Sequence, residues 1–194
     1  MNPTVREHLP EALRLRSGQA YTDCAHMRIV ITVVAVLVCL ILAVVLLGAL
    51  VPKTHLASRT VVVNAPPDAV WSAITTVEAY PQWRDLKASI AIPPQAGRRA
   101  WRETDRDGQQ ITMIVVEEVP PRRLVTRIAD KNLGFGGTWT YELTPAAGGT
   151  QVTIIEDGEI QNPMFRCFAR YVFGYHATMD DYLERLKKRV ASRA

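Results

Sequence analysis

The stretch that decides the fold is Met164–Val190, MFRCFARYVFGYHATMDDYLERLKKRV. Its apolar residues recur at steps of three and four, which predicts one helix of roughly seven turns with an apolar stripe along one side. Asn162 and Pro163 precede it as a cap residue and a first-turn residue. Gly174 weakens the middle of this helix and allows a bend there. A stripe this long and aromatic needs a large apolar partner.

The segment before this helix predicts a β-sheet that could be that partner. A β-branched run at Arg59–Val63 predicts a first strand, and two short helices follow at about 67–75 and 77–80. Turn signals then separate six predicted strands: Lys87–Ile92, Arg99–Thr104, Gln109–Glu117, Arg123–Ile128, Thr138–Leu143 and Gln151–Asp157. Alternating polar and apolar residues indicate a sheet with one covered face. The order predicts an α+β domain whose sheet curls round the terminal helix.

Several motifs in this order resemble one family. They are Val62–Trp71 (VVNAPPDAVW), Tyr80–Trp83 (YPQW), Gly137–Pro145 (GTWTYELTP), Gly149–Thr153 (GTQVT) and Asn162-Pro163. Together they are similar to the START-like, or SRPBCC, superfamily of polyketide cyclase/dehydrase and lipid-transport proteins, over about residues 57–190. The resemblance implies a helix-grip fold, in which a seven-stranded antiparallel sheet grips the C-terminal helix around a hydrophobic cavity. It does not imply a substrate, because no single catalytic motif runs through the family.

A separate apolar segment, Ile29–Val51, contains no charged residue. At 1.5 Å per residue it spans about 34 Å, enough to cross a hydrocarbon core of about 30 Å. We therefore predict a transmembrane helix at 29–51, a linker at 52–58 and a helix-grip domain at 59–190. Residues 1–28 form a short tail. We interpret Met27-Arg28 as the start of the anchor, which places the upstream residues outside the native protein.

The distribution of charged residues predicts the orientation of the transmembrane helix and argues against nucleic acid as a partner. Basic residues are slightly more frequent before the span than after it, which favours a cytoplasmic N-terminus and a periplasmic or extracellular C-terminal domain. The formal net charge of +4 is spread among residues of both signs, so the sequence does not favour nucleic-acid binding. The sequence makes no prediction about protein partners.

Strand parity and the helical stripe predict which side chains face the cavity. The predicted ligand-binding residues are Trp101, Met113, Val115, Phe135, Trp139, Tyr141, Phe168, Tyr171, Val172, Tyr175 and Met179. Phe135 belongs to the glycine-rich connection 132–137, which is either an ordinary loop or a gate over the cavity mouth. No His, Cys, Asp and Glu cluster has metal-ligand spacing, so we predict neither a metal nor a cofactor.

One carboxylate is a weak candidate for catalysis. Glu103 shares the parity of Trp101, so it faces the cavity if Trp101 does. The favoured interpretation is a solvated Glu103 at a twisted edge. His55 lies next to the membrane segment, and His176 falls at the boundary of the stripe rather than at its centre.

These observations predict a membrane-anchored domain that binds, and in one version carries, a hydrophobic small molecule or lipid without chemistry of its own. One alternative is a cyclase, dehydratase or hydrolase in which Glu103, Tyr141 or Tyr175 acts as acid or base. Another is a membrane-tethered interaction module whose cavity is filled by its own side chains.

Overall fold

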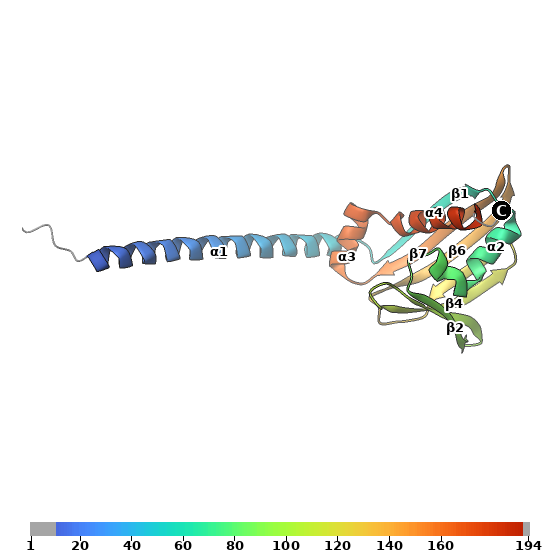
Figure 1. The fold of residues 1–194 in the computed structure, drawn as a ribbon, viewed down its shortest axis with the longest axis horizontal. Coiled ribbons are helices and arrows are strands. Elements are labelled where there is room, and N and C mark those ends of the chain that lie inside the picture. Colours follow the sequence, from blue (N-terminus) through green and yellow to red (C-terminus); the bar gives the residue numbers. More distant parts are fainter. Residues whose placement is uncertain (1–10, 192–194) are drawn as a thin grey trace, which may run out of the picture. The chain divides into compact units, whose positions relative to one another are not determined.

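The structure, a computed structural model, describes the backbone of residues 11–191 and the side chains of residues 26–191. Its strands form one antiparallel sheet with the order β1-β7-β6-β5-β4-β3-β2 (Figure 1). Their bounds are β1 Thr54–Val63, β2 Ala88–Gln95, β3 Arg98–Thr104, β4 Gln110–Val119, β5 Arg123–Ile128, β6 Phe135–Ala146 and β7 Gly149–Ile160. The helices are α1 Glu11–Leu50, α2 Pro67–Thr75, the 3-10 helix η1 Val77–Gln82, α3 Pro163–Phe168, the π-helical η2 Ala169–Phe173 and α4 Ala177–Ala191.

The core lies between the inner face of this sheet and the helices α4 and α2. Leu143 and Ile154 of the central strands are fully buried, as are Met179, Leu183 and Leu186 of α4. The inward side chains alternate along β6 and β7, as expected for a sheet with one covered face. The predicted α+β helix-grip fold is confirmed, with seven antiparallel strands and two short helices after the first strand.

The prediction of one continuous terminal helix was wrong. The segment consists of α3, the π-helical η2 and α4, and the chain turns at Gly174, whose φ is 73°. Only a residue without a Cβ atom adopts such a positive φ readily, so the glycine at 174 allows the chain to turn after α3 and η2. As a result Tyr171 and Val172, expected on the buried stripe, are 65% and 63% exposed. The start was predicted correctly, because Asn162 Oδ1 accepts a hydrogen bond from Met164 N at 2.8 Å.

The first strand begins earlier than predicted. β1 starts at Thr54 rather than Arg59, because β7 continues to Ile160 and gives residues 54–58 backbone partners. The predicted linker 52–58 therefore shrinks to the few residues between Leu50 and Thr54. Upstream, the chain is helical from Glu11, where the sequence predicted a short tail, and residues 1–10 of that tail lie outside the described residues.

The helix α1 contains an apolar stretch, His26–Leu50, long enough to cross a membrane. Its side chains are largely exposed, since none of the most apolar part is buried inside the protein. The residues up to Leu46 form one compact unit, and Leu47–Ala194 forms another. The sheet, the core and the cavity described below all belong to the second unit.

The second unit includes the last turn of α1, which packs on α3. The Arg166 side chain is 5% exposed, and its Nε donates a hydrogen bond to the Gly48 carbonyl at 3.0 Å. A Cβ atom on Gly48 would lie 1.8 Å from the Pro163 carbonyl oxygen, so only glycine permits this approach. Arg166 thus gives a partner to one of the carbonyls that a helix end leaves without an intrahelical bond.

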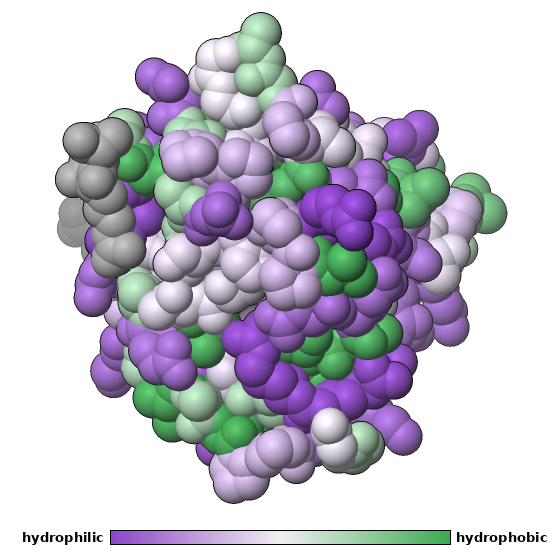
Figure 2. Space-filling view, turned by 90° about the vertical axis from the view of Figure 1, so that its right-hand side faces the viewer, coloured by the Kyte–Doolittle hydropathy of each residue, from purple (hydrophilic) through white to green (hydrophobic). Residues whose placement is uncertain are grey.

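The surface of the domain is mixed in character. Figure 2 shows one face on which hydrophilic residues are interspersed with small groups of hydrophobic ones. Two arginines of the middle strands form ion pairs on the surface. Arg99 pairs with Glu118 at 3.0 Å, and Arg123 pairs with Glu117 at 3.2 Å. These exposed pairs contribute little to stability.

Candidate functional site

A cavity of about 370 Å³ opens on the inner face of the sheet. Strands β3, β4 and β6 supply most of one wall through Trp101, Met113, Trp139 and Tyr141, and the turn before α4 supplies Tyr175. The complete lining is His55, Tyr80, Arg84, Trp101, Glu103, Ile111, Met113, Thr126, Ile128, Phe135, Gly136, Gly137, Thr138, Trp139, Tyr141, Glu156, Glu159, Ile160, Ala169, Gly174, Tyr175 and Thr178. Aromatic walls with a few polar groups are typical of a site for a small organic molecule.

One polar group of the cavity is the buried ion pair between Arg84 and Glu103. Glu103 is 8% exposed, and its Oε1 accepts hydrogen bonds from Arg84 Nη1 and Trp101 Nε1, both at 2.8 Å. The Arg84 guanidinium also lies over the rings of Tyr80 and Tyr182, 4.7 and 5.3 Å from their centroids. The favoured prediction of a solvated Glu103 was therefore wrong, because its carboxylate is buried and bonded to Arg84 and Trp101.

Burial and charge shift the ionisation of these groups. Burial would lower the pKa of Arg84, but the Glu103 carboxylate together with Tyr80, Tyr182 and Tyr141 outweighs burial, and the pKa of Arg84 is raised. Burial also raises the pKa of Tyr141 and of Tyr182. Arg84 therefore stays charged and both tyrosines stay neutral at physiological pH, so Tyr141 offers a hydroxyl to a ligand rather than a phenolate.

A second polar group lies where β1 and β7 meet. His55 Nε2 is 3.5 Å from Glu156 Oε1, and the His55 ring stacks on Tyr175 with centroids 4.1 Å apart. Gly158 stands opposite His55 in the sheet, and a Cβ atom there would lie 2.5 Å from His55 Cε1. The imidazole is thus held between bare backbone and a tyrosine ring.

The structure brings together only part of the predicted ligand-binding set. Six of its residues line the cavity: Trp101, Met113, Phe135, Trp139, Tyr141 and Tyr175. The weak catalytic candidate Glu103 lines it too. Val115 and Met179 are buried in the core without lining the cavity. Phe168, Tyr171 and Val172 do not line it either and have exposed side chains, because the turn at Gly174 separates them from α4. Phe135 opens β6 and is 38% exposed at the rim.

The lining residues that sequence reasoning missed include His55, Tyr80, Arg84 and Glu156, which have polar side chains. Glu156 could have been found, since it has the parity of the buried Val152 and Ile154 in a predicted strand. His55 could not, because residues 54–58 carry no strand pattern of their own. Their strand structure depends on β7, which is about a hundred residues away in the sequence.

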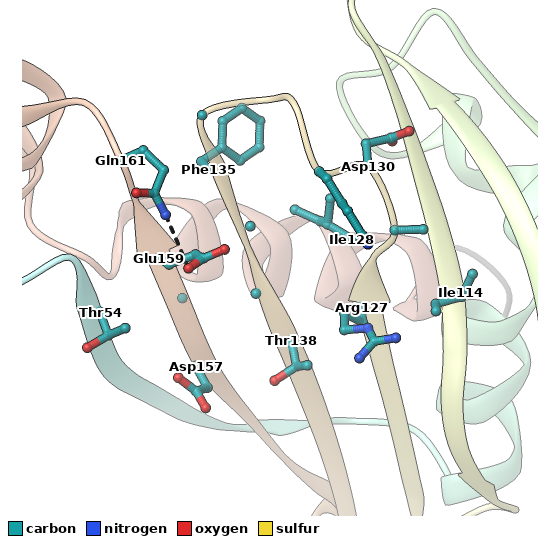
Figure 3. A pocket seen from close by; sticks show the side chains of 16 residues that line it. Thr54, Ile114, Arg127, Ile128, Asp130, Phe135, Thr138, Asp157, Glu159 and Gln161 are labelled. Atoms are coloured by element: carbon teal, nitrogen blue, oxygen red, sulfur yellow. Dashed lines mark hydrogen bonds between the residues drawn. The ribbon is translucent and has the colours of Figure 1, made fainter.

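A larger depression, of about 740 Å³, lies on the other face of the sheet. Figure 3 shows Thr54, Thr138 and Asp157 on three neighbouring strands at this depression. Asp157 alternates with Glu156 along β7, so its side chain points away from the inner cavity. The lining of this depression mixes polar and charged side chains with Ile114, Ile128 and Phe135, whereas aromatic rings form most of the walls of the inner cavity, so the inner cavity is the stronger candidate. Across residues 26–191, no three His, Cys, Asp or Glu side chains are grouped to hold a metal.

Glu156 gives the domain a pH dependence with a defined sign. Burial raises the pKa of Glu156, and nearby His55 and Trp139 offset part of that effect. The folded state therefore binds a proton more readily than the unfolded state. The resulting loss of stability builds up as the pH rises from the unfolded pKa of Glu156 through its raised folded pKa, and it is complete above that value. Relative to Glu156→Gln, the wild-type protein should gain stability as the pH falls from about 8 to about 4. Urea unfolding of both proteins across this range measures the difference. A difference that is flat or shrinks toward acid would contradict the assignment.

Comparison with known proteins identifies the family. Residues 54–191 match the family described as polyketide cyclase/dehydrase and lipid transport. A search of curated proteins finds no match. The Zhui aromatase/cyclase from Streptomyces sp. R1128 has a TM-score of 0.58 at 15% identity, covering 72% of this chain and 95% of that one. A START superfamily protein from Mycobacterium smegmatis has a TM-score of 0.56 at 22% identity, covering 72% and 99%.

A third similar structure is the di-domain aromatase/cyclase StfQ from the steffimycin biosynthetic pathway. It has a TM-score of 0.58 at 14% identity, and the match covers 73% of this chain but only 52% of StfQ. The chain thus spans about half the length of that relative. At these identities the likeness to solved structures shows the fold alone. With the family match over most of the chain, the conclusion is that this protein belongs to the polyketide cyclase/dehydrase and lipid transport family.

Proposed function

We propose that this protein is anchored in a membrane by its N-terminal helix and binds a hydrophobic small molecule or a single lipid chain in the inner cavity. The observation that carries the proposal is the cavity of about 370 Å³ with walls from Trp101, Met113, Trp139 and Tyr175. This volume exceeds the roughly 300 Å³ at which ligand pockets begin. It therefore supports a binding function over an interaction module with a filled core.

The cavity volume also limits the ligand. At about 30 Å³ per water molecule, 370 Å³ corresponds to roughly a dozen waters. A two- or three-ring aromatic molecule or part of one acyl chain has that size, whereas a whole two-chain phospholipid is far larger. Met113 adds a deformable wall that suits a range of shapes.

Two features support a position at the membrane. The apolar stretch His26–Leu50 is about 37 Å long as a helix, enough to span a bilayer. In the second unit, α3 and η2 expose a cluster of apolar side chains, which are Phe165, Phe168, Tyr171, Val172 and Phe173. Large exposed apolar patches mark surfaces that meet a membrane or a partner. We place the C-terminal domain in the periplasm or outside the cell, as the distribution of basic residues favours.

Membrane integration has a direct test. The full chain should stay with the membrane fraction through washes with high salt and alkaline carbonate, because a spanning apolar helix is not released by charge screening. A peripheral membrane protein from the same cells serves as the control and should be released. Recovery of this chain in the soluble fraction after carbonate would exclude the anchor.

Ligand binding in the cavity is tested with the full chain in lipid nanodiscs. Quenching of tryptophan fluorescence by 2-methylnaphthalene, corrected with empty nanodiscs, should be saturable. Tyr175→Ala should weaken it about tenfold, since Tyr175 is an aromatic wall of the cavity. The matched control is Tyr171→Ala, four residues earlier, which removes a ring that is 65% exposed and outside the cavity. Equal effects of the two substitutions, or no saturable quenching, would overturn the proposal.

An enzymatic function of the cyclase or dehydratase type is the second candidate. The observation that favours it is the pair His55 and Glu156, which places an imidazole and a carboxylate together in the cavity. Such a pair can accept and donate a proton in general acid–base catalysis. Glu103 suits this role less well, because Arg84 and Trp101 already occupy its carboxylate.

A further inference from the structure

The two carboxylates of the cavity differ in their capacity for a ligand. Glu103 accepts two hydrogen bonds at 2.8 Å from Arg84 and Trp101, so its carboxylate oxygen is already occupied. Glu156 lies 3.5 Å from His55 Nε2, beyond the usual length of a hydrogen bond. A carboxylate carries about four lone-pair sites, and a partly buried one gains stability from each donor that it finds. Glu103 is in addition neutralised by the adjacent Arg84, whereas Glu156 has only the longer contact with His55 and the nearby Trp139 ring nitrogen, so Glu156 has the greater capacity left for a ligand.

The surroundings of Glu156 are built to hold His55 in place. β1 pairs His55 with Gly158, the residue that follows Glu156 by two, so the imidazole lies against backbone. Tyr175 covers the other face of the ring at an interplanar angle of 11°. Gly158 has no side chain, and a Cβ atom would collide with Cε1 and Nε2 of His55. Because both faces of the ring are in contact, the His55 side chain is already ordered, and little further conformational entropy is lost when a ligand binds.

Apolar surface surrounds this polar pair within the cavity. Trp139 stands directly opposite Glu156 on β6, and Tyr175 stands beyond His55. A ligand that is wholly apolar would leave the His55–Glu156 pair without a polar partner.

We propose that His55 and Glu156 recognise one hydroxyl group, phenolic or alcoholic, on an otherwise apolar ligand whose body packs against Trp139 and Tyr175. The hydroxyl donates a hydrogen bond to the Glu156 carboxylate and accepts one from His55 Nε2–H, so both side chains gain a hydrogen-bond partner from the same group. This inference rests on the proposed function, since it names the ligand class of the same cavity. A site built to bond a hydroxyl discriminates strongly against an analogue that lacks it, because its own polar groups are then left unpaired.

The test compares two probes of nearly equal shape, 2-naphthol and 2-methylnaphthalene, which differ in a hydroxyl and a methyl group. The full chain in lipid nanodiscs should bind 2-naphthol about tenfold more tightly than 2-methylnaphthalene. Glu156→Leu should remove this preference by weakening 2-naphthol binding while leaving 2-methylnaphthalene binding unchanged or improved. Glu117→Leu is the matched control, because Glu117 is 46% exposed and pairs with Arg123. The control should keep the preference.

A second variant guards against a folding defect in Glu156→Leu. His55→Phe keeps an aromatic ring on Tyr175 but removes the Nε2 donor, and it should also lower the preference for 2-naphthol. Equal binding of both probes by the wild-type chain would overturn the inference and leave the proposed function standing. Equal weakening of both probes by folded Glu156→Leu and His55→Phe would show a structural role and overturn it too. Failure of the wild-type chain to bind either probe would overturn the proposed function itself.

Discussion

Replacing Leu186 with alanine should lower the free energy of unfolding by about 3 to 5 kcal/mol. Leu186 lies on α4, is fully buried and packs in the core between α4 and the sheet. The surrounding side chains can fill only part of the space that its side chain leaves. Urea unfolding followed by tryptophan fluorescence measures the loss. All four tryptophans lie within residues 54–191, so the signal reports on the domain rather than on α1.

The matched control is Val172→Ala on the other side of Gly174. Both residues belong to the stripe that predicted one continuous helix, yet Val172 is 63% exposed in the structure. Its truncation should change the free energy of unfolding by less than about 0.5 kcal/mol. Comparable losses at Leu186 and Val172 would mean that the stripe is buried along its whole length and that the chain does not turn at Gly174.

Arg84→Met should cost about 3 kcal/mol, because it leaves the Glu103 carboxylate buried without its cation. Arg84 and Glu103 are 22% and 10% exposed in their side chains, and their atoms are 2.8 Å apart. Adding Glu103→Leu to Arg84→Met should recover much of the loss, since the unpaired charge is then gone. Urea unfolding of the two single variants, the double variant and the wild-type protein completes the cycle.

An exposed ion pair provides the control for this cycle. Arg106 and Asp85 lie 2.9 Å apart, with side chains 62% and 61% exposed. Arg106→Met should therefore change stability by less than about 1 kcal/mol. If Arg84→Met were as mild as Arg106→Met, the pair in the cavity would be solvated in solution, and Glu103 would become available as an acid or base.

Local patterns predicted most of the fold. The alternation of Trp139 and Tyr141 with polar neighbours set the inner face of β6, and shared parity placed Glu103 beside Trp101. Turn residues such as Asp107-Gly108 separated the strands at nearly their observed ends. These features depend on neighbours within a few residues, so one segment at a time contains the information.

The polar part of the candidate site depended on contacts between distant segments. His55 enters the cavity only because β7 extends far enough to pair with residues 54–58. Tyr175 reaches His55 only because the backbone turns at Gly174. The apolar period continues across Gly174 unchanged, so periodicity gave no sign that the residues before it face away from α4. Gly174 itself indicated that a bend was possible, but nothing within either segment showed that the bend would form or that residues 54–58 would pair with β7.

The hydrogen bond from Arg166 to Gly48 determines where a soluble fragment should begin. A fragment that starts at Lys53 would discard the Gly48 carbonyl and leave the buried Arg166 guanidinium without this acceptor. It would also uncover Cys167, whose Cβ lies only 3.3 Å from the position of a Cβ on Gly48. Fragments cut there should expose a reactive thiol and cross-link on storage, whereas cutting before Leu47 retains the cover. Thiol labelling of Cys167 then becomes a simple quality control for any truncated preparation.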